Sequence, residues 1–319
     1  MSKLSTLTSL DSAAGADVSQ VSSLDNLLNK ANFDFTVERT TLHDPEGEHI
    51  PGKYLLRRED TDHVLGVVGG KYHPVSTRAM LEPFYNLVKK HGGKYENAGV
   101  VQGGKKCWVS ATLPGSIKVP GRSHDIIEQR LVCLIHHDGG GRNSYFPLAH
   151  RVACNNQLRL LTKAAQHSQF GFTHTKNWEE SLKSAIDGFQ AAIEARNEFA
   201  RVVERLSTAA MDDNEVRAFS KRLYRLDDKK APSKQAEARG EQLVDLFKHG
   251  AGNMGKTRWD ALNAVTELLD HHSSKRYKTD AHRRASTQNR FISNSLRGYG
   301  DTIKQRAVRL LTNTEIKLK

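Results

Sequence analysis

The sequence contains few cysteines and no long apolar run. Only Cys107, Cys133 and Cys154 occur among 319 residues. So small and odd a number argues against a disulfide framework and is typical of a reducing compartment. No apolar run approaches the ~20 residues of a membrane span. The first twenty residues lack an apolar core and include Asp11 and Asp17. We therefore expect no membrane, signal or transit segment and a cytoplasmic location.

Positive charge is the most informative feature of the composition. The 48 Lys and Arg exceed the 36 Asp and Glu, which gives a net charge of +12. Residues 271–319 hold twelve Lys or Arg and three acids, a net +9, so the first 270 residues are nearly neutral. Such a field favours polyanionic partners, nucleic acid first and an acidic membrane surface second.

The pattern of residues 31–175 predicts an antiparallel α+β core, after a flexible tail at residues 1–30 with a short helix at Leu24–Lys30. Three strands come first, the last broken at Gly69-Gly70 and ended by Pro74. A helix is predicted over Thr77–His91, with a cap at Ser76 or Thr77. A hairpin around Gly103-Gly104 and two strands around 138–142 form a β-meander. A second helix is predicted to begin within 148–165.

From Trp178 the apolar period changes to 3.6, which predicts an all-helical second half. One long helix is expected over 178–206, and further helices over 214–226, 234–249, 257–272 and 302–311. We therefore expect an N-terminal antiparallel β-meander with packed helices, followed by an all-helical basic C-terminal region. The predicted units are the core, a helical region at 176–272 and a basic C-terminal segment at 273–319.

Residues Gly250–Thr257 spell the phosphate-loop pattern GxxxxGK[ST]. A phosphate loop must follow a buried strand. The preceding residues Leu243, Leu246 and Phe247 instead have helical spacing. The alternative is a glycine-rich connection between helices in which Thr257 caps the next helix. Lys256 and Arg258 would then still stand at a helix N-terminus, where a phosphate can dock. We predict no cofactor.

Histidines and acids offer a second chemistry, a metal-dependent phosphodiesterase or nuclease. No segment holds three or four ligands at a known metal spacing, and neighbouring histidines on a strand point to opposite sides. These groups are better explained as strand-edge and helix-end histidines, so the metal site is only an alternative. The candidate ligands are His136, His137, Asp138, Asp270 and His271. No nucleophile motif occurs, so we predict no catalytic residue and a non-catalytic role.

Basic residues interleaved with aromatics support nucleic-acid binding best. Cations track phosphates, and aromatics such as Tyr277, Phe291 and Tyr299 can stack on unpaired bases. No helix-turn-helix or zinc finger indicates reading of duplex sequence. The predicted nucleic-acid contacts are Lys105, Lys106, Arg142, Arg151, Arg159, Lys163, Lys256, Arg258, Lys275, Arg276, Lys278, Arg283, Arg284 and Arg290.

Several stretches resemble a known family. RVACNNQL is similar to its Arg-Val-x-Cys-x-Asn-x-Leu pattern, through Arg151 to Leu158, and NAVTELLDHH to its Asn-Ala-Val-Thr-x-x-x-Asp-His signature, through Asn263 to His271. The chain thus resembles the phage- and plasmid-associated proteins grouped as domain of unknown function 932. The family's glycine segment normally lacks the GKT spelling, which further weakens the phosphate-loop interpretation.

The resemblance implies a protein of mobile elements, in the cytoplasm of a bacterial host. The order of elements over 60–165 is also similar to the core of Rad-type single-strand annealing proteins, which form rings that hold single-stranded DNA. This resemblance concerns fold alone. The leading hypothesis is a homo-oligomer, with a ring as one arrangement, that binds single-stranded DNA and anneals it without ATP in recombination. The alternatives are the phosphodiesterase or an interaction protein that counters a host defence or repair factor.

Overall fold

The computed structural model describes residues 15–152, 156–159, 171–194, 196–226, 233–272 and 300–313. The strands are β1 (Ala16–Asp17), β2 (Val37–His43), β3 (His49–Arg58), β4 (Val64–Gly69), β5 (Lys94–Val101), β6 (Lys106–Lys118), β7 (Ile126–His136), β8 (Asn143–Arg151), β9 (Asn156–Arg159) and β10 (Gly171–Phe172). The helices are α1 (Leu24–Lys30), α2 (Thr77–Lys90), α4 (Trp178–Glu194), α5 (Arg196–Thr208), α6 (Asp213–Tyr224), α7 (Lys234–His249), α8 (Arg258–His271) and α10 (Asp301–Thr312). N-terminal antiparallel sheets followed by several helices confirm the predicted α+β class.

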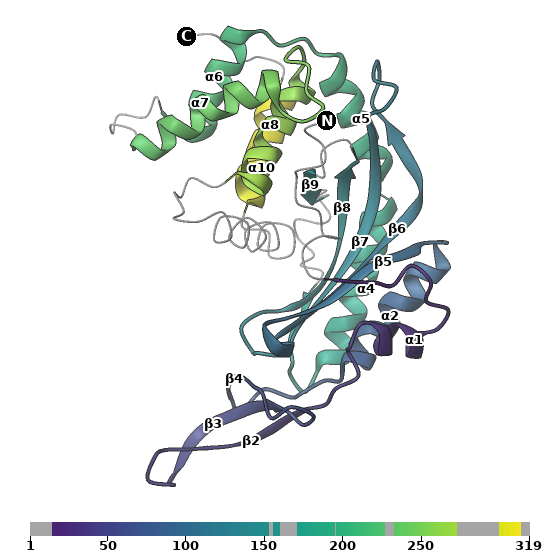
Figure 1. The fold of residues 1–319 in the computed structure, drawn as a ribbon, viewed down its shortest axis with the longest axis vertical. Helices are drawn as coiled ribbons and strands as arrows, with labels where there is room; N and C mark the ends of the chain where they lie inside the picture. The colour runs from purple at the N-terminus through teal and green to yellow at the C-terminus, as the bar shows by residue number, and fades with distance from the viewer. Residues whose placement is uncertain are drawn as a thin grey trace.

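The strands form two antiparallel sheets. The main sheet has the order β1-β5-β6-β7-β8-β10, and β9 pairs with β8. The second sheet, β2-β3-β4, projects from one end of the main sheet, and we call it the arm (Figure 1). The β5–β6 hairpin turns at Gly103 and Gly104, whose φ values of 68° and 108° favour glycine. Both the hairpin and its glycine turn were predicted.

Helices α1, α2 and α4 cover one face of the main sheet. Helix α2 begins where predicted, because the Ser76 hydroxyl accepts a hydrogen bond from the amide of Ala79. Its Phe84 packs with Tyr145 of β8, with ring centroids 5.6 Å apart. Leu27 of α1 and Leu182 of α4 belong to the same buried cluster. This cluster is the core of the N-terminal half.

The remaining helices form a unit around α8. Trp259 to His271 of α8 are all buried. Helices α5, α7 and α10 pack against it, and it also contacts β9. Val119, Ile127 and Ala149 extend this second core onto the main sheet. The helical unit therefore sits at the end of the main sheet opposite the arm (Figure 1). None of the described helices has both the length and the apolar character of a membrane span.

Three sequence expectations were wrong. The helix predicted at Leu24–Lys30 is confirmed as α1, but the described residues around it are packed rather than mobile: Leu27 and Leu28 are buried in the core, and β1 pairs with β5. Where a helix was predicted to begin within 148–165, the described residues are instead strands: 148–151 end β8 and 156–159 form β9. Short apolar runs fit either structure, and pairing with β7 decides for a strand. The range 178–206, predicted as one helix, holds α4 and α5; α4 packs on β8 and α5 packs on α8.

Candidate nucleic-acid interface

The predicted contacts that the structure describes lie at the two ends of the main sheet. β6 begins, β7 ends and β8 begins beside the arm, which we call the arm end. The opposite end, where the helical unit packs, is the helical end. β7 has eleven residues, and at ~3.4 Å per residue the two ends are roughly 35 Å apart. In a B-form duplex, where the phosphates of one strand are ~3.4 Å apart along the axis, that span corresponds to about ten nucleotides.

Lys105, Lys106 and Arg142 come together at the arm end. Lys106 is buried, and its Nζ lies 3.2 Å from Asp138 Oδ2 and 3.1 Å from Gln102 Oε1. Arg142 is exposed and donates a hydrogen bond to the carbonyl of Gly171. Lys105 is partly exposed. Lys105 and Arg142 are thus placed to meet a phosphate, whereas the charge of Lys106 is paired with a carboxylate.

A histidine cluster lies beneath these cations. His137 is 1% exposed, and its Nε2 lies 3.1 Å from Thr77 Oγ1. Burial, with the neighbouring His174, lowers the pKa of His137 to about 3. Burial also lowers the pKa of His174, although its Nε2 lies 2.8 Å from the carbonyl oxygen of His136. These histidines are neutral at physiological pH and pack the arm connection against the sheet. No sequence signal linked His174 to this cluster.

Asp138 closes the glycine-rich turn between β7 and β8. Its side chain accepts a hydrogen bond of 2.9 Å from the amide of Gly140. Although burial opposes it, hydrogen bonding with His136 and Gly140 and the charge of Lys106 hold the pKa of Asp138 well below its usual range. Asp138 is therefore a charged partner for Lys106.

The candidate metal ligands do not come together. His136, His137 and Asp138 lie at the arm end, whereas Asp270 and His271 belong to α8 at the helical end. Asp270 Oδ1 lies 2.7 Å from Lys304 Nζ of α10, and both side chains are buried. Within the described ranges, no three His, Cys, Asp or Glu side chains are grouped as metal ligands. The geometry gives the phosphodiesterase alternative no assembled site.

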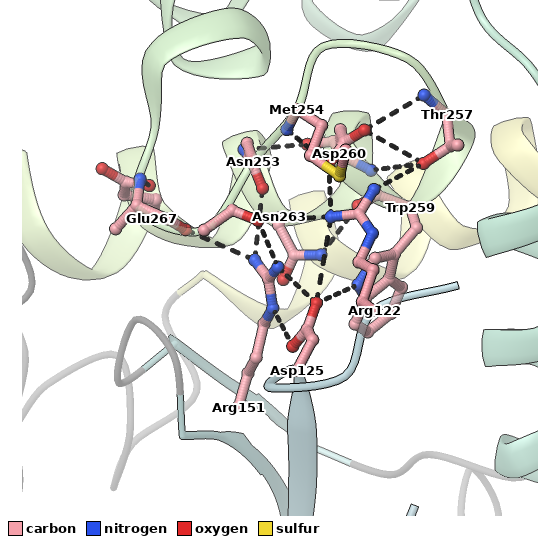
Figure 2. Close-up of polar contacts among 12 residues, drawn as sticks. Arg122, Asp125, Arg151, Asn253, Met254, Thr257, Trp259, Asp260, Asn263 and Glu267 are labelled. Carbon is pink, nitrogen blue, oxygen red and sulfur yellow. Dashed lines mark hydrogen bonds and ion pairs between the residues drawn. The ribbon is translucent and has the colours of Figure 1, made fainter. Parts of the chain in front are cut away.

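Arg151 joins the main sheet to the helical unit (Figure 2). Its guanidinium makes two hydrogen bonds, of 2.7 and 2.5 Å, to the Asp125 carboxylate. It also donates to the carbonyl of Gly252 at 2.8 Å and to Asn253 Oδ1 at 3.2 Å. Only 2% of Arg151 is exposed. The predicted phosphate contact of Arg151 is therefore not supported, because its donors face protein acceptors inside the fold.

Three further residues, Arg122, Trp259 and Asp260, complete this contact region. We call it the junction, and it comprises Arg122, Asp125, Arg151, Asn253, Trp259 and Asp260. The indole nitrogen of Trp259 donates to Asp125 Oδ2 at 3.3 Å. Arg122 Nη1 lies 2.8 Å from Asp260 Oδ1, although the two residues are far apart in sequence. Each buried charge in these pairs has a charged or dipolar partner, as burial of an ion requires.

The Gly250–Thr257 loop connects α7 to α8 and is not a phosphate loop. Its amides face a carboxylate of the chain itself: Asp260 accepts hydrogen bonds of 3.1 Å each from the amides of Met254, Lys256 and Thr257 (Figure 2). Thr257 caps α8 through a capping box with Asp260. The geometry that would cradle a phosphate is occupied, and the helix–helix connection expected as the alternative is confirmed.

The remaining predicted contacts lie at the helical end or outside the described residues. Lys256 is exposed on the loop. Arg258 donates to the carbonyls of Leu311 and Asn313, at 2.9 and 3.3 Å, and so holds the end of α10. Arg159 ends β9. Outside the described residues lie Lys163, Lys275, Arg276, Lys278, Arg283, Arg284 and Arg290.

The second face of the main sheet joins the two ends. Its centre is a buried apolar cluster of Trp108, Val132, Leu134, Phe146 and Leu148. In the described part of the chain, strand residues alone make up this cluster. Toward the helical end it becomes polar, where Arg130 Nε lies 3.1 Å from Glu96 Oε2.

The comparison with known families spans both halves of the fold. The family model described as "Domain of unknown function (DUF932)" matches residues 64–291. The chain belongs to the DUF932 family. The match runs from β4 through the main sheet and junction to beyond α8, and it leaves β2 and β3 of the arm outside. No curated protein and no solved structure matches the chain.

The residues that carried the DUF932 resemblance have structural contacts. Arg151 pairs with Asp125, and Asp270 pairs with Lys304. Asn263 donates a hydrogen bond of 2.7 Å to the carbonyl of Trp259. We therefore assign these DUF932 positions to the attachment and internal packing of the helical unit.

Proposed function

We propose that this protein binds single-stranded nucleic acid and pairs complementary strands without ATP. The observation that carries the proposal is the net charge of +9 over residues 271–319, against about neutral for the rest of the chain. Phosphate contacts dominate the affinity of proteins for nucleic acid, and their number sets the salt dependence. A concentration of cations in one segment is the feature that such binding needs.

The contacts of α8 and α10 support a defined position for the two ends of residues 272–300, which include most of the cations of the basic segment. Residues 272–300 connect these helices and contain seven Lys or Arg and one acid. The buried Lys304–Asp270 pair, at 2.7 Å, fastens α10 to α8. Residues 272 and 300, the two ends of this connection, are therefore held at the helical end of the main sheet, where Lys256 is also exposed.

The distribution of cations supports a path along the main sheet. Lys105 and Arg142 stand at the arm end, and Lys256 and the basic segment stand at the helical end. We propose that one strand runs between them over roughly 35 Å, with its phosphates on the cations. Aromatic residues of the basic segment, Tyr277, Phe291 and Tyr299, would stack on bases without reading their sequence.

Annealing in this proposal needs no nucleotide hydrolysis. The one sequence match to an ATP site is the Gly250–Thr257 loop, whose amides are held by Asp260. Pairing would follow when two strands are concentrated on oppositely charged protein and their repulsion is reduced. The bases stay accessible because the protein's contacts are to phosphates and ring faces.

The test compares two variants with the same loss of charge. In the first, Arg283, Arg284 and Arg290 become alanine. The matched control removes three exposed cations of α5 and α6, Arg201, Arg217 and Lys221. Binding of a labelled single strand is measured by gel shift, and annealing of complementary oligonucleotides by fluorescence quenching without ATP.

Each single-strand phosphate contact contributes a factor of about five near 0.1 M salt, so loss of three lowers affinity about 100-fold. We expect that loss, with slower annealing, in the first variant and less than about tenfold in the control. Equal losses in both variants, or no binding by the native protein, would refute the proposal. Binding without annealing would restrict the function to strand protection and refute the pairing step.

A further inference from the structure

The arm differs in charge from the rest of the molecule. Residues 37–69 contain seven acids and four Lys or Arg, a net −3, so the remainder carries +15. The acids include Glu46 and Glu48, exposed in the turn between β2 and β3. An acidic element that projects from a basic protein is electrostatically complementary to that same protein.

The outward face of the arm is apolar at its centre. Val64 and Val67 of β4 are 45% and 52% exposed, and they are two of four large apolar side chains exposed in the described residues. Leu55 of β3 is the cross-strand partner of Val67 and is only half-buried. Cross-strand partners lie on the same face of a sheet, so these side chains form one strip.

The arm also presents unpaired strand edges. Its order is β2-β3-β4, so β2 and β4 each have one neighbour among the described strands. Its inward face has its own small core of Leu56, Leu65 and Val68. That face is fixed to the main sheet, since a Cβ added to Gly66 would lie 2.4 Å from the carbonyl oxygen of Asp138. The inward face is thus occupied, whereas Val64 and Val67 leave the outward face exposed, and no such buried cluster forms there among the described residues.

We propose that the outward face of the arm docks on the basic surface of a second copy of this chain. The apolar strip of Leu55, Val64 and Val67 forms the centre of the contact, and the acids of the arm meet cations around it. Because unlike surfaces meet, the interface is heterologous, and repetition gives a ring or an open filament rather than a two-fold dimer. The proposal concerns assembly of the protein alone and does not rest on nucleic-acid binding.

The first test removes the apolar strip without changing charge. Val64→Ser with Val67→Ser is compared with Val152→Ser and Met254→Ser, a matched pair at the other two exposed apolar positions. Full-length, nuclease-treated protein is measured by light scattering over a concentration series, so that bridging by nucleic acid does not contribute. We expect the arm variant to need at least about tenfold higher concentration to assemble, and the control to match the native protein.

The second test reverses the arm's charge and keeps the proposal falsifiable if the valine variant unfolds. Glu46→Lys with Glu48→Lys is compared with Glu237→Lys and Glu241→Lys, two exposed acids of α7. The arm reversal should weaken assembly, whereas the α7 reversal should not, and salt should weaken native assembly. Circular dichroism checks folding of each variant.

A native protein with the mass of one chain at all concentrations would overturn the inference, and so would arm variants that assemble like their controls. Strand binding is measured separately by gel shift. Failure of assembly therefore remains distinguishable from failure of the proposed function.

Discussion

Replacement of Asp125 by alanine tests the junction that fixes the helical unit to the sheet. The change removes two hydrogen bonds to Arg151, of 2.7 and 2.5 Å, and the acceptor for the indole of Trp259. Arg151 stays 2% exposed and loses its carboxylate partner, while its contacts to the carbonyls of Ala251 and Gly252 and to Asn253 Oδ1 remain. Loss of one partner from a buried ion pair costs about 3–5 kcal/mol. We expect destabilisation near 4 kcal/mol, because the remaining acceptors are neutral.

The assay is urea denaturation followed by tryptophan fluorescence, to which Trp259 in the junction contributes. Asp213→Ala is the control, because Asp213 pairs with Lys248 at an exposed site, where side-chain exposures are 54% and 36%. Exposed pairs are worth about 0–1 kcal/mol. The double variant Asp125→Leu with Arg151→Met should recover much of the loss, since apolar residues can replace a buried pair. A cost for Asp125→Ala as small as that of the control would refute the reasoning.

Three other predictions follow from the structure. Lys256→Ala should give the same calorimetric titration with ATP as the native protein, because Asp260 already accepts hydrogen bonds from the loop amides. Saturable ATP binding by the native protein that is lost in this variant would contradict this prediction. Asp260→Asn should destabilise the fold by about 3 kcal/mol by removing the charged partner of Arg122, as measured by urea denaturation. Stability should fall with acid: the pKa of His137 is lowered from 6.5 to about 3 and that of His271 to about 4. As pH falls below 6.5, these two histidines take up protons in the unfolded state but not yet in the folded state. Their contribution to the free energy of unfolding is therefore complete above pH 6.5 and is lost as pH falls toward 3–4. At about 1.4 kcal/mol per pH unit each, the loss by pH 5 is roughly 4 kcal/mol, and denaturation curves at pH 8 and 5 that coincide would exclude it.

Local sequence patterns predicted helices and strands well where capping residues or glycines mark their ends. The helix at Lys234–His249 has the bounds expected from its period, with Ser233 as cap. The helix beginning at Thr77 and the hairpin at Gly103 were also placed correctly, because a cap and two glycines mark them. Caps and glycine turns depend on only a few neighbouring residues, and over so short a range a helix start or a turn differs clearly in backbone conformation from the alternatives.

The candidate site was less predictable, because its partners are distant in sequence. The sequence around Arg151 does not show whether its side chain faces solvent or Asp125, and its loop partners lie about 100 positions later in the chain. The same holds for His174 beside His137. The spacing of Thr257 and Asp260 did carry a signal, since a threonine and an acid three residues apart form a capping box. That pattern indicates that Asp260 accepts a hydrogen bond from the amide of Thr257, although it says nothing of Arg122 or of the other loop amides.

The salt dependence of single-strand binding tests the central claim most directly. For single strands, the slope of log affinity against log salt concentration is about −0.7 per phosphate contact. The account predicts a steep slope for the native protein, and a slope lower by about 2 when Arg283, Arg284 and Arg290 are replaced by alanine. The control lacking Arg201, Arg217 and Lys221 should keep the native slope. A slope near zero, or the same slope in all three proteins, would contradict binding through the basic segment.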